Sequence, residues 1–103
     1  MKTKKTNQVT RTPSPARFEF EHTTAQSVCL AGSFNDWNPE ATEMIPDRPG
    51  HWVKELFLPP GTYEYLFVVD GEWVEDPRAA ESVPNPFSRN NSVLRVAEVV
   101  VTV

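Results

Sequence analysis

Residues 62–75, TYEYLFVVDGEWVE, contain two runs of strand-forming residues on either side of a single Asp-Gly pair. Aromatic and β-branched residues dominate the first run, which is typical of a β-strand. Asp70 and Gly71 are the residues that a two-residue type I′ hairpin turn prefers. The stretch therefore predicts a β-hairpin with one strand over 62–69 and a return strand over 72–75.

The turn also fixes which side chains share a face of this hairpin. With the Asp-Gly pair in the turn, Val68 lies opposite Trp73, and Phe67 lies on the other face. The face that carries Phe67 is largely aromatic and is expected to form the core. The other face carries carboxylates and is expected to be an outer surface. Its members are Glu64, Leu66, Val68, Trp73 and Glu75. An alternative is that a loop folds over Trp73 and buries it in a small satellite cluster.

The rest of the chain shows short strands separated by turn-rich segments. Phe18 and Phe20 alternate with charged residues, which is the period-2 pattern of a half-buried strand. Ten prolines in 103 residues argue against long helices. Further strands are expected over 18–21, 27–31, 51–58 and 92–103, with a short one near 44–45 and a loop over 78–91. About seven strands in all predict an all-β fold, an antiparallel β-sandwich.

Charge is divided unevenly along the chain. The net charge is −4, yet Lys2, Lys4, Lys5 and Arg11 all fall in the first eleven residues, where no acid occurs. Subtracting these four from ten basic residues leaves six against fourteen acids in 12–103, a net charge of −8. Because a domain with this negative charge repels the phosphate backbone of nucleic acids, nucleic acid is not an expected partner. Residues 1–13 are expected to be an unstructured basic leader, and 14–103 a single domain.

Composition excludes several other classes of protein. The single cysteine, Cys29, excludes an internal disulfide framework and a cysteine-based zinc cluster. His22 and His51 lack metal-ligand spacing, so neither metal nor cofactor is expected. No apolar stretch approaches the roughly 18 residues of a membrane span, and no secretory signal is present. These features predict a cytoplasmic protein that has no membrane partner.

Catalysis is not expected either. A β/α-barrel hydrolase needs about 250 residues, far more than this chain has. Glycoside hydrolysis needs two carboxyl groups about 5–10 Å apart, one of them with a raised pKa. Glu72 and Glu75 are close in sequence, but strand alternation places them on opposite faces, where they are interpreted as surface charges.

The three tryptophans are expected in two kinds of environment. Trp52 opens a strand with leucines at even spacing and is expected in the core. Trp37 lies in the turn-rich segment SFNDWNP, and Trp73 lies on the outer face of the hairpin. The face of an exposed indole attracts the apolar C–H face of a pyranose ring, and nearby amides can both donate to and accept from sugar hydroxyls. Trp37 and Trp73 therefore predict a carbohydrate site.

Four motifs occurring in order over 16–97, with an Asp-Pro pair at 76–77, carry a family resemblance. They are VCLAGSFNDW (28–37), GHW (50–52), PGTYEYLFVVDGEW (60–73) and NSVL (91–94). In this combination the chain resembles carbohydrate-binding module family 48. That family includes the glycogen-binding domain of the AMP-activated kinase β subunit and the N-terminal domains of isoamylase and glycogen branching enzymes. The resemblance implies an immunoglobulin-like sandwich of the early-set type.

The resemblance also implies roles for individual residues. Trp37 and Trp73 match the two indoles that stack on glucose units of an α-1,4-glucan. Asn91 matches an asparagine that hydrogen-bonds sugar hydroxyls. Phe87 falls where the kinase module has an apolar residue that reaches into the curve of the glucan, and Arg89 falls near a polar contact residue.

One position departs from the kinase pattern. Leu66 stands where kinase-type modules carry a lysine that contacts sugar hydroxyls, and a leucine cannot donate that hydrogen bond. A charge-assisted bond is worth about 1.5–3 kcal/mol. Either Arg89 or Asn90 compensates, or affinity is weaker than in the kinase module.

The expected function is non-catalytic binding of α-1,4-glucan, as glycogen, starch or maltooligosaccharide. An alternative is a protein-interaction module that uses 92–103 as a free edge for β-augmentation by a second copy or another protein. A third possibility is an accessory domain that packs on a glucan-modifying enzyme.

Overall fold

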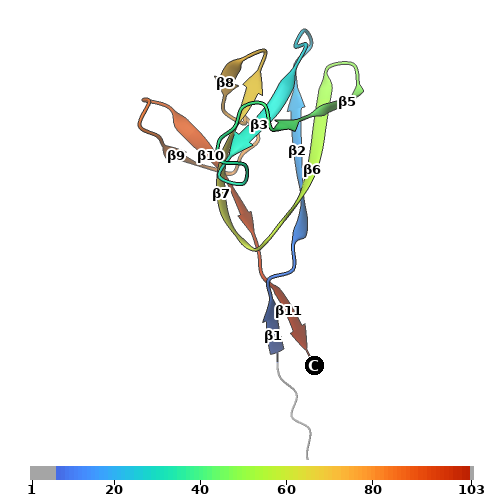
Figure 1. The fold of residues 1–103 in the computed structure, drawn as a ribbon, viewed down its shortest axis with the longest axis vertical. Coiled ribbons are helices and arrows are strands. Elements are labelled where there is room, and N and C mark those ends of the chain that lie inside the picture. Colours follow the sequence, from blue (N-terminus) through green and yellow to red (C-terminus); the bar gives the residue numbers. More distant parts are fainter. Residues whose placement is uncertain (1–6, 103) are drawn as a thin grey trace, which may run out of the picture.

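The computed structural model describes residues 7–102, in which every regular element is a β-strand (Figure 1). The strands are β1 (Asn7–Thr10), β2 (Ser14–Glu21), β3 (Val28–Gly32), β4 (Thr42–Glu43), β5 (Ile45–Arg48), β6 (His51–Leu58), β7 (Gly61–Val69), β8 (Glu72–Val74), β9 (Glu81–Pro84), β10 (Asn90–Val96) and β11 (Val99–Thr102). Eleven strands replace the predicted seven or so, because several short pairings join the main ones.

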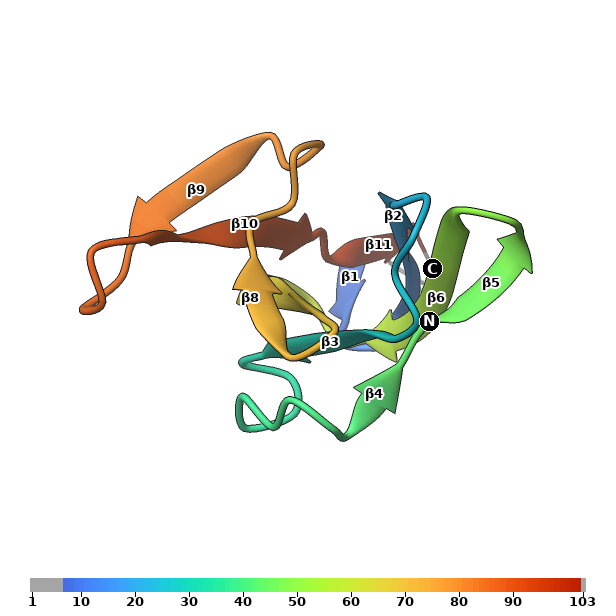
Figure 2. The same ribbon diagram turned by 90° about the horizontal axis from the view of Figure 1, so that it is seen from above.

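Two antiparallel sheets pack on each other as an immunoglobulin-like sandwich, which confirms the predicted fold class. The six-stranded sheet has the order β4-β3-β7-β10-β9, with β8 paired to β7. The three-stranded sheet has the order β2-β6-β5. Seen from above in Figure 2, the β9–β10 hairpin and the β3–β4 loop project toward the same side of the molecule, with β8 between them.

The core fills the space between the two sheets with aromatic side chains. Phe67 of β7 is completely buried, and its ring centroid lies 4.7 Å from that of Phe20 on β2. Trp52 is 9% exposed and belongs to the same cluster, as predicted. Aromatic side chains bury about 150–250 Å² each, so this cluster accounts for much of the hydrophobic stabilisation.

The hairpin formed by β7 and β8 has the predicted register. Val68 pairs with Trp73 and Phe67 pairs with Val74. The Asp70 carboxylate then fastens the turn to the β2–β3 loop, because its Oδ1 accepts hydrogen bonds from the backbone N–H groups of Gln26 and Ser27. The Asp-Gly pair thus holds two loops together as well as reversing the chain.

Two expectations for the C-terminal half are wrong. The segment 78–91 contains β9, which pairs with β10 and makes a second hairpin. The expected single strand 92–103 is divided at Ala97–Glu98 into β10 and β11. Because Ser92 and Val93 pair with β7 on one side and with β9 on the other, this part of β10 offers no free edge for β-augmentation.

A two-stranded ribbon of β1 and β11 projects from the sandwich (Figure 1). Residues 7–10 therefore depart from the unstructured leader expected over 1–13, of which 1–6 lie outside the described residues. The pairing partner of β1 is distant in sequence, so local periodicity gives no sign of it. At the base of the ribbon, Arg11 donates hydrogen bonds to the Glu98 carboxylate at 2.8 Å and to the Pro60 carbonyl at 3.0 Å.

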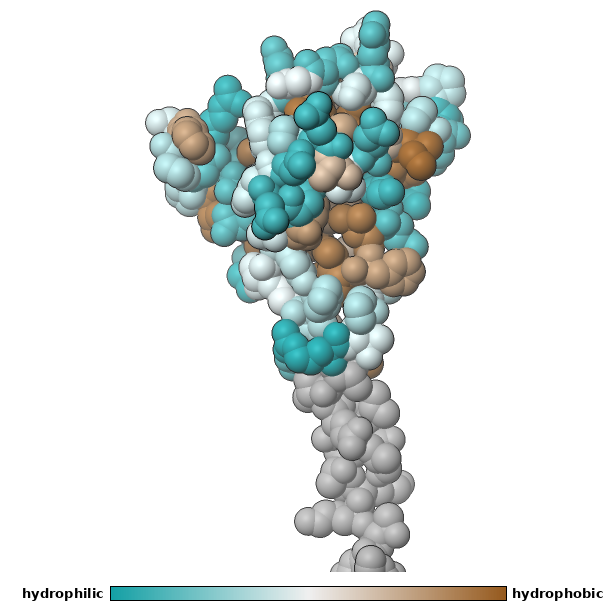
Figure 3. Space-filling view, in the orientation of Figure 1, coloured by the Kyte–Doolittle hydropathy of each residue, from teal (hydrophilic) through white to brown (hydrophobic). Residues whose placement is uncertain are grey.

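Apolar residues reach the surface in patches between hydrophilic ones (Figure 3). Ile45 and Phe57 are 60% and 64% exposed on the three-stranded sheet, and Phe87 is 80% exposed at the tip of the β9–β10 hairpin. Within residues 7–102 there is no helix long and apolar enough to cross a membrane.

Candidate functional site: an aromatic hollow on the six-stranded sheet

A hollow of about 800 Å³ lies on the outer side of the six-stranded sheet. We call it the aromatic hollow. Its lining residues are Ser33, Trp37, Glu64, Leu66, Trp73, Asn85, Pro86, Phe87, Arg89 and Asn91. They come from the β3–β4 loop, β7, β8, β10 and the loop of the β9–β10 hairpin. All six residues that the sequence analysis selected for sugar contact lie in this one place.

The two indoles cover part of the sheet and leave the rest of their surface open. Trp37 and Trp73 are half-buried and pack on a small cluster of Cys29, Ala31 and Val68. Burial raises the pKa of the Cys29 thiol, so the thiol stays uncharged beneath them. Trp73 therefore lies on the outer face, as the register predicts, and packs on a satellite cluster while remaining only half-buried.

The expectation that Leu66 lies on an open outer surface is wrong, because this side chain is buried. It lies on the predicted face and lines the aromatic hollow, yet it is only 5% exposed. Val68 on the same face is 6% exposed. The indoles of Trp37 and Trp73 pack on Val68, and Leu66 lines the same hollow as both indoles. A strand pattern alone cannot report such contacts with other segments.

The β3–β4 loop fixes Trp37 in an unusual backbone conformation. Asp36 and Trp37 both have φ of 57°, a left-handed region that costs bulky residues free energy. Asn35 holds the loop, because its side chain accepts from the Gly32 N–H and donates to the Leu30 carbonyl. The Trp37 N–H also donates to the Gly32 carbonyl. Several hydrogen bonds thus sustain the strained position of the indole.

Gly32 is required where this loop leaves β3. A Cβ atom at that position would lie 2.5 Å from the Glu64 carbonyl oxygen and 2.9 Å from the Tyr65 Cβ. Such contacts are too close for any side chain, and the first is with backbone that cannot swing away. The absence of a side chain at Gly32 therefore lets the loop start directly against β7.

The tip of the β9–β10 hairpin forms one wall of the hollow. Asn85 Oδ1 accepts from the backbone N–H groups of Phe87 and Arg89, and the Asn85 N–H donates to the Arg89 carbonyl. The Arg89 guanidinium then donates to the Trp73 carbonyl at 3.0 Å, which ties the hairpin to β8. This arrangement presents Phe87, 80% exposed, at the rim.

A chain of polar side chains crosses the hollow from the hairpin to β7. Asn85 Nδ2 donates to Asn91 Oδ1 at 3.0 Å, and Asn91 Nδ2 donates to Glu64 Oε1 at 3.0 Å. Asn91 is 9% exposed, so less of its amide is open than the sequence suggests. Sequence reasoning missed Glu64 and Asn85. The hairpin register had placed Glu64 on this face, but as a solvated surface charge.

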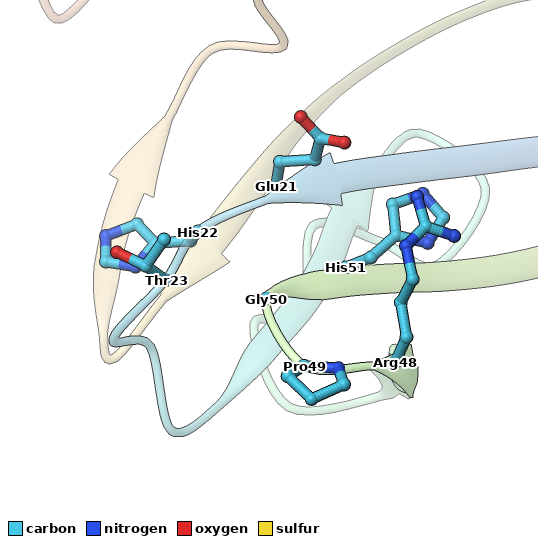
Figure 4. Close-up of a pocket in the computed structure, with 7 residues that line it drawn as sticks. All are labelled: Glu21, His22, Thr23, Arg48, Pro49, Gly50 and His51. Carbon is cyan, nitrogen blue, oxygen red and sulfur yellow. The ribbon is translucent and has the colours of Figure 1, made fainter.

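A second hollow, of about 500 Å³, lies at one end of the three-stranded sheet (Figure 4). We call it the charged hollow. Its lining residues are Glu21, His22, Thr23, Arg48, Pro49, Gly50 and His51. In Figure 4 the Arg48 side chain runs beside the His51 ring.

Both ring nitrogens of His51 are hydrogen-bonded to carboxylates. It is 5% exposed, and its Nε2 and Nδ1 atoms lie 2.8 Å from Glu19 Oε1 and 2.5 Å from Asp47 Oδ1. The hydrogen bonds to His51 hold the pKa values of the Glu19 and Asp47 carboxyls below their ordinary range. His22 caps a loop instead, since its Nδ1 accepts from the Thr24 and Ala25 N–H groups. In the part of the chain that the structure describes, no three potential ligands gather into a metal site.

Comparison with known proteins gives the family. The family model described as the glycogen recognition site of AMP-activated protein kinase matches residues 14–101. The 5'-AMP-activated protein kinase subunit beta-2 of Mus musculus is 43% identical over 54 residues, which is 50% of this chain and 18% of the relative. Subunit beta-1 of Sus scrofa is 34% identical over 73 residues, 69% of this chain and 55% of the relative. Subunit beta-1 of Homo sapiens is 34% identical over 73 residues, 69% of this chain and 25% of the relative.

The chain therefore spans between about a fifth and about half of the length of these relatives. The family match runs from the start of β2 into β11 and so includes every strand that builds the aromatic hollow. This chain belongs to the glycogen-recognition family of AMP-activated protein kinase.

Proposed function

We propose that the aromatic hollow binds α-1,4-glucan, as glycogen, starch or maltooligosaccharide, by stacking on tryptophan. The observation that carries the proposal is the pair of half-buried indoles, Trp37 and Trp73, that open into one hollow. Membership of a glycogen-recognition family supports the same ligand.

The chemistry of the hollow suits a sugar chain. An indole face is weakly negative and apolar, and the C–H groups of a glucose ring lie flat on it. Phe87 adds an exposed aromatic side chain at the rim, while Asn91 and Arg89 supply polar groups beside the indoles. A surface that alternates apolar rings with amide and charged groups matches a ligand that has apolar faces and hydroxyl edges.

The domain binds glucan without hydrolysing it in this proposal. Among the described residues that line the hollow, Glu64 alone carries a carboxylate. Hydrolysis of a glycosidic bond by the usual mechanism needs two such groups. The relatives are named as kinase subunits, and we extend the proposal to a role in which this domain brings a partner protein to glucan in the cytoplasm.

Calorimetric titration with maltoheptaose tests the proposal. Two stacked rings and a few exposed hydrogen bonds give an expected Kd between about 10 μM and 1 mM, or roughly −7 to −4 kcal/mol. Cellohexaose, whose β-1,4 linkage gives a straighter chain of the same sugar, is the matched control and is expected to bind at least about 10-fold more weakly. Equal affinity for both ligands, or no binding of maltoheptaose at 10-fold above the upper Kd, would contradict the proposal.

A further inference from the structure

We propose that Glu64 contacts the ligand in the aromatic hollow and that its carboxylate restricts this hollow to glucans without negative charge. This inference rests on the proposed function and names the chemical class of glucan that the site accepts. The carboxylate of Glu64 is half-buried and lines the same hollow as the aromatic side chains of Trp37, Trp73 and Phe87.

The position of Glu64 directs its side chain into the hollow. It lies on β7, on the same face as Leu66, and is half-buried among the lining residues. Its backbone is fixed as well, because the Glu64 N–H donates to Ser33 Oγ at 3.2 Å. A half-buried charge beside apolar groups is screened less by water than an exposed one.

One oxygen of this carboxylate is held and the other is left for a ligand. Oε1 accepts from Asn91 Nδ2 at 3.0 Å, and within residues 7–102 no protein group donates to Oε2. Asn91 is oriented in turn by Asn85, which donates to its Oδ1. Asn91 therefore acts as a positioning residue for Glu64. A carboxylate accepts hydrogen bonds only, and sugar hydroxyls can donate them, with the strength of charge-assisted bonds.

Within residues 7–102, Glu64 takes part in none of the ion pairs that the structure contains. The cationic side chain in the hollow is Arg89, which is exposed and gives Nη1 to the Trp73 carbonyl. Leu66, the next residue on the same face of β7, brings no charge. A phosphate ester or a carboxylate on a glucan that lies along β7 would therefore meet the charge of Glu64, while Arg89 lies on the exposed hairpin loop.

The experiment compares three ligands on three proteins by calorimetric titration. The ligands are maltoheptaose, maltoheptaose carrying one phosphate monoester, and maltoheptaose carrying one primary amine. The proteins are the wild type, Glu64→Gln and the control Glu72→Gln, which removes an exposed carboxylate next to Trp73 that does not line the hollow. Glutamine keeps the acceptor for Asn91 and removes the charge.

The wild type is expected to bind the phosphorylated ligand at least about 10-fold more weakly than maltoheptaose, which corresponds to about 1.4 kcal/mol. It should bind the aminated ligand more tightly. Glu64→Gln should bring all three affinities within about 3-fold of one another and weaken maltoheptaose binding about 3- to 10-fold. Glu72→Gln should match the wild type within about 2-fold, and thermal melts check that each variant is folded.

Wild-type protein that binds the phosphorylated ligand as tightly as maltoheptaose overturns the inference, and this arm needs no variant to fold. It is also overturned if Glu64→Gln retains the wild-type order of affinities, or if Glu72→Gln changes that order equally. In each of these cases maltoheptaose still binds, so the proposed function stands. Wild-type protein that binds no maltoheptaose at all overturns both.

Discussion

The aromatic hollow and the charged hollow differ in how many of their side-chain groups already have hydrogen-bond or ion-pair partners within the protein. In the charged hollow, the buried ring of His51 is hydrogen-bonded to carboxylates at both nitrogens. Arg78 spans the Glu19 and Glu21 carboxylates next to it, at 4.0 and 3.4 Å. In the aromatic hollow, by contrast, part of each indole surface stays exposed, and one carboxylate oxygen of Glu64 has no hydrogen-bond donor among the described residues. A hollow whose groups are already paired stabilises the fold, whereas one with unpaired groups is free to bind.

The largest effect is expected from removing one indole. Trp73→Ala should weaken maltoheptaose binding at least about 30-fold, or about 2 kcal/mol, because it deletes half of the stacking surface. The variant should remain folded with a lower melting temperature, since Trp73 packs on Cys29 and Val68. Phe57→Ala removes a 64% exposed aromatic from the three-stranded sheet and should leave the Kd unchanged. If Trp73→Ala and Phe57→Ala weakened maltoheptaose binding equally, the aromatic hollow would bind the ligand no more specifically than the three-stranded sheet.

Leu66→Lys adds a hydrogen-bond donor to the aromatic hollow. We expect up to about 10-fold tighter maltoheptaose binding, because an ammonium group beside Glu64 can donate to sugar hydroxyls. Leu66 is 5% exposed, so the change should also cost about 1–2 kcal/mol of unfolding free energy. Calorimetric titration and thermal melts measure the two effects. A stable variant with unchanged affinity would show that the ligand does not reach this position.

The charged hollow should govern acid stability and leave binding alone. The folded-state pKa values of Glu19 and Asp47 are lowered, mainly by hydrogen bonds to His51, so their contribution is present above the ordinary carboxyl pKa near 4. It is lost as the pH falls through the lowered values. His51→Gln should therefore lower the melting temperature at pH 7 and flatten its decline toward pH 3.

The matched control for this prediction is His22→Gln, because His22 caps a loop through backbone N–H groups. It should keep the wild-type pH dependence of the melting temperature. Both histidine variants should bind maltoheptaose at pH 7 within about 2-fold of the wild type. A large loss of affinity in His51→Gln would mean that the two hollows are not independent.

The smallest expected effect is that of salt on glucan binding. A neutral ligand releases no counterions, so its Kd should change less than about 2-fold between 50 and 500 mM sodium chloride. The arginine ion pairs around the charged hollow are exposed and are weakened by salt, so the melting temperature should fall modestly over the same range. A steep salt dependence of the Kd, measured by titration, would point to a charged ligand instead.

Local sequence signals predicted the parts of the fold that depend on neighbours in the chain. The Asp-Gly turn sets the hairpin register, and Trp52 follows strand alternation into the core. In contrast, β1 and β9 form only through pairing with β11 and β10, and their own segments lack a strand pattern. Turn residues around β9 resemble those of an irregular loop, so its pairing could not be foreseen.

Six of the ten residues that line the aromatic hollow were named from the sequence, but their burial was not predicted. The motifs pointed to the two indoles and Asn91, the family resemblance pointed to Phe87, and all four line one hollow. Leu66 is buried although strand alternation places it on the outer face, because other segments surround the hollow that it lines. The bond from Asn91 to Glu64 joins residues on neighbouring strands and follows from rotamers that a sequence does not specify.

The left-handed backbone of Trp37 has a kinetic consequence. A loop held at φ of 57° by hydrogen bonds from Asn35 and Gly32 has its indole in place before any sugar arrives. Encounter then requires no prior ordering of the site, and association should proceed in one step at a rate typical of preformed surfaces, about 10⁵–10⁷ M⁻¹s⁻¹. Differences among glucans of different length should therefore appear in how long each complex lasts, and hardly in how fast it forms.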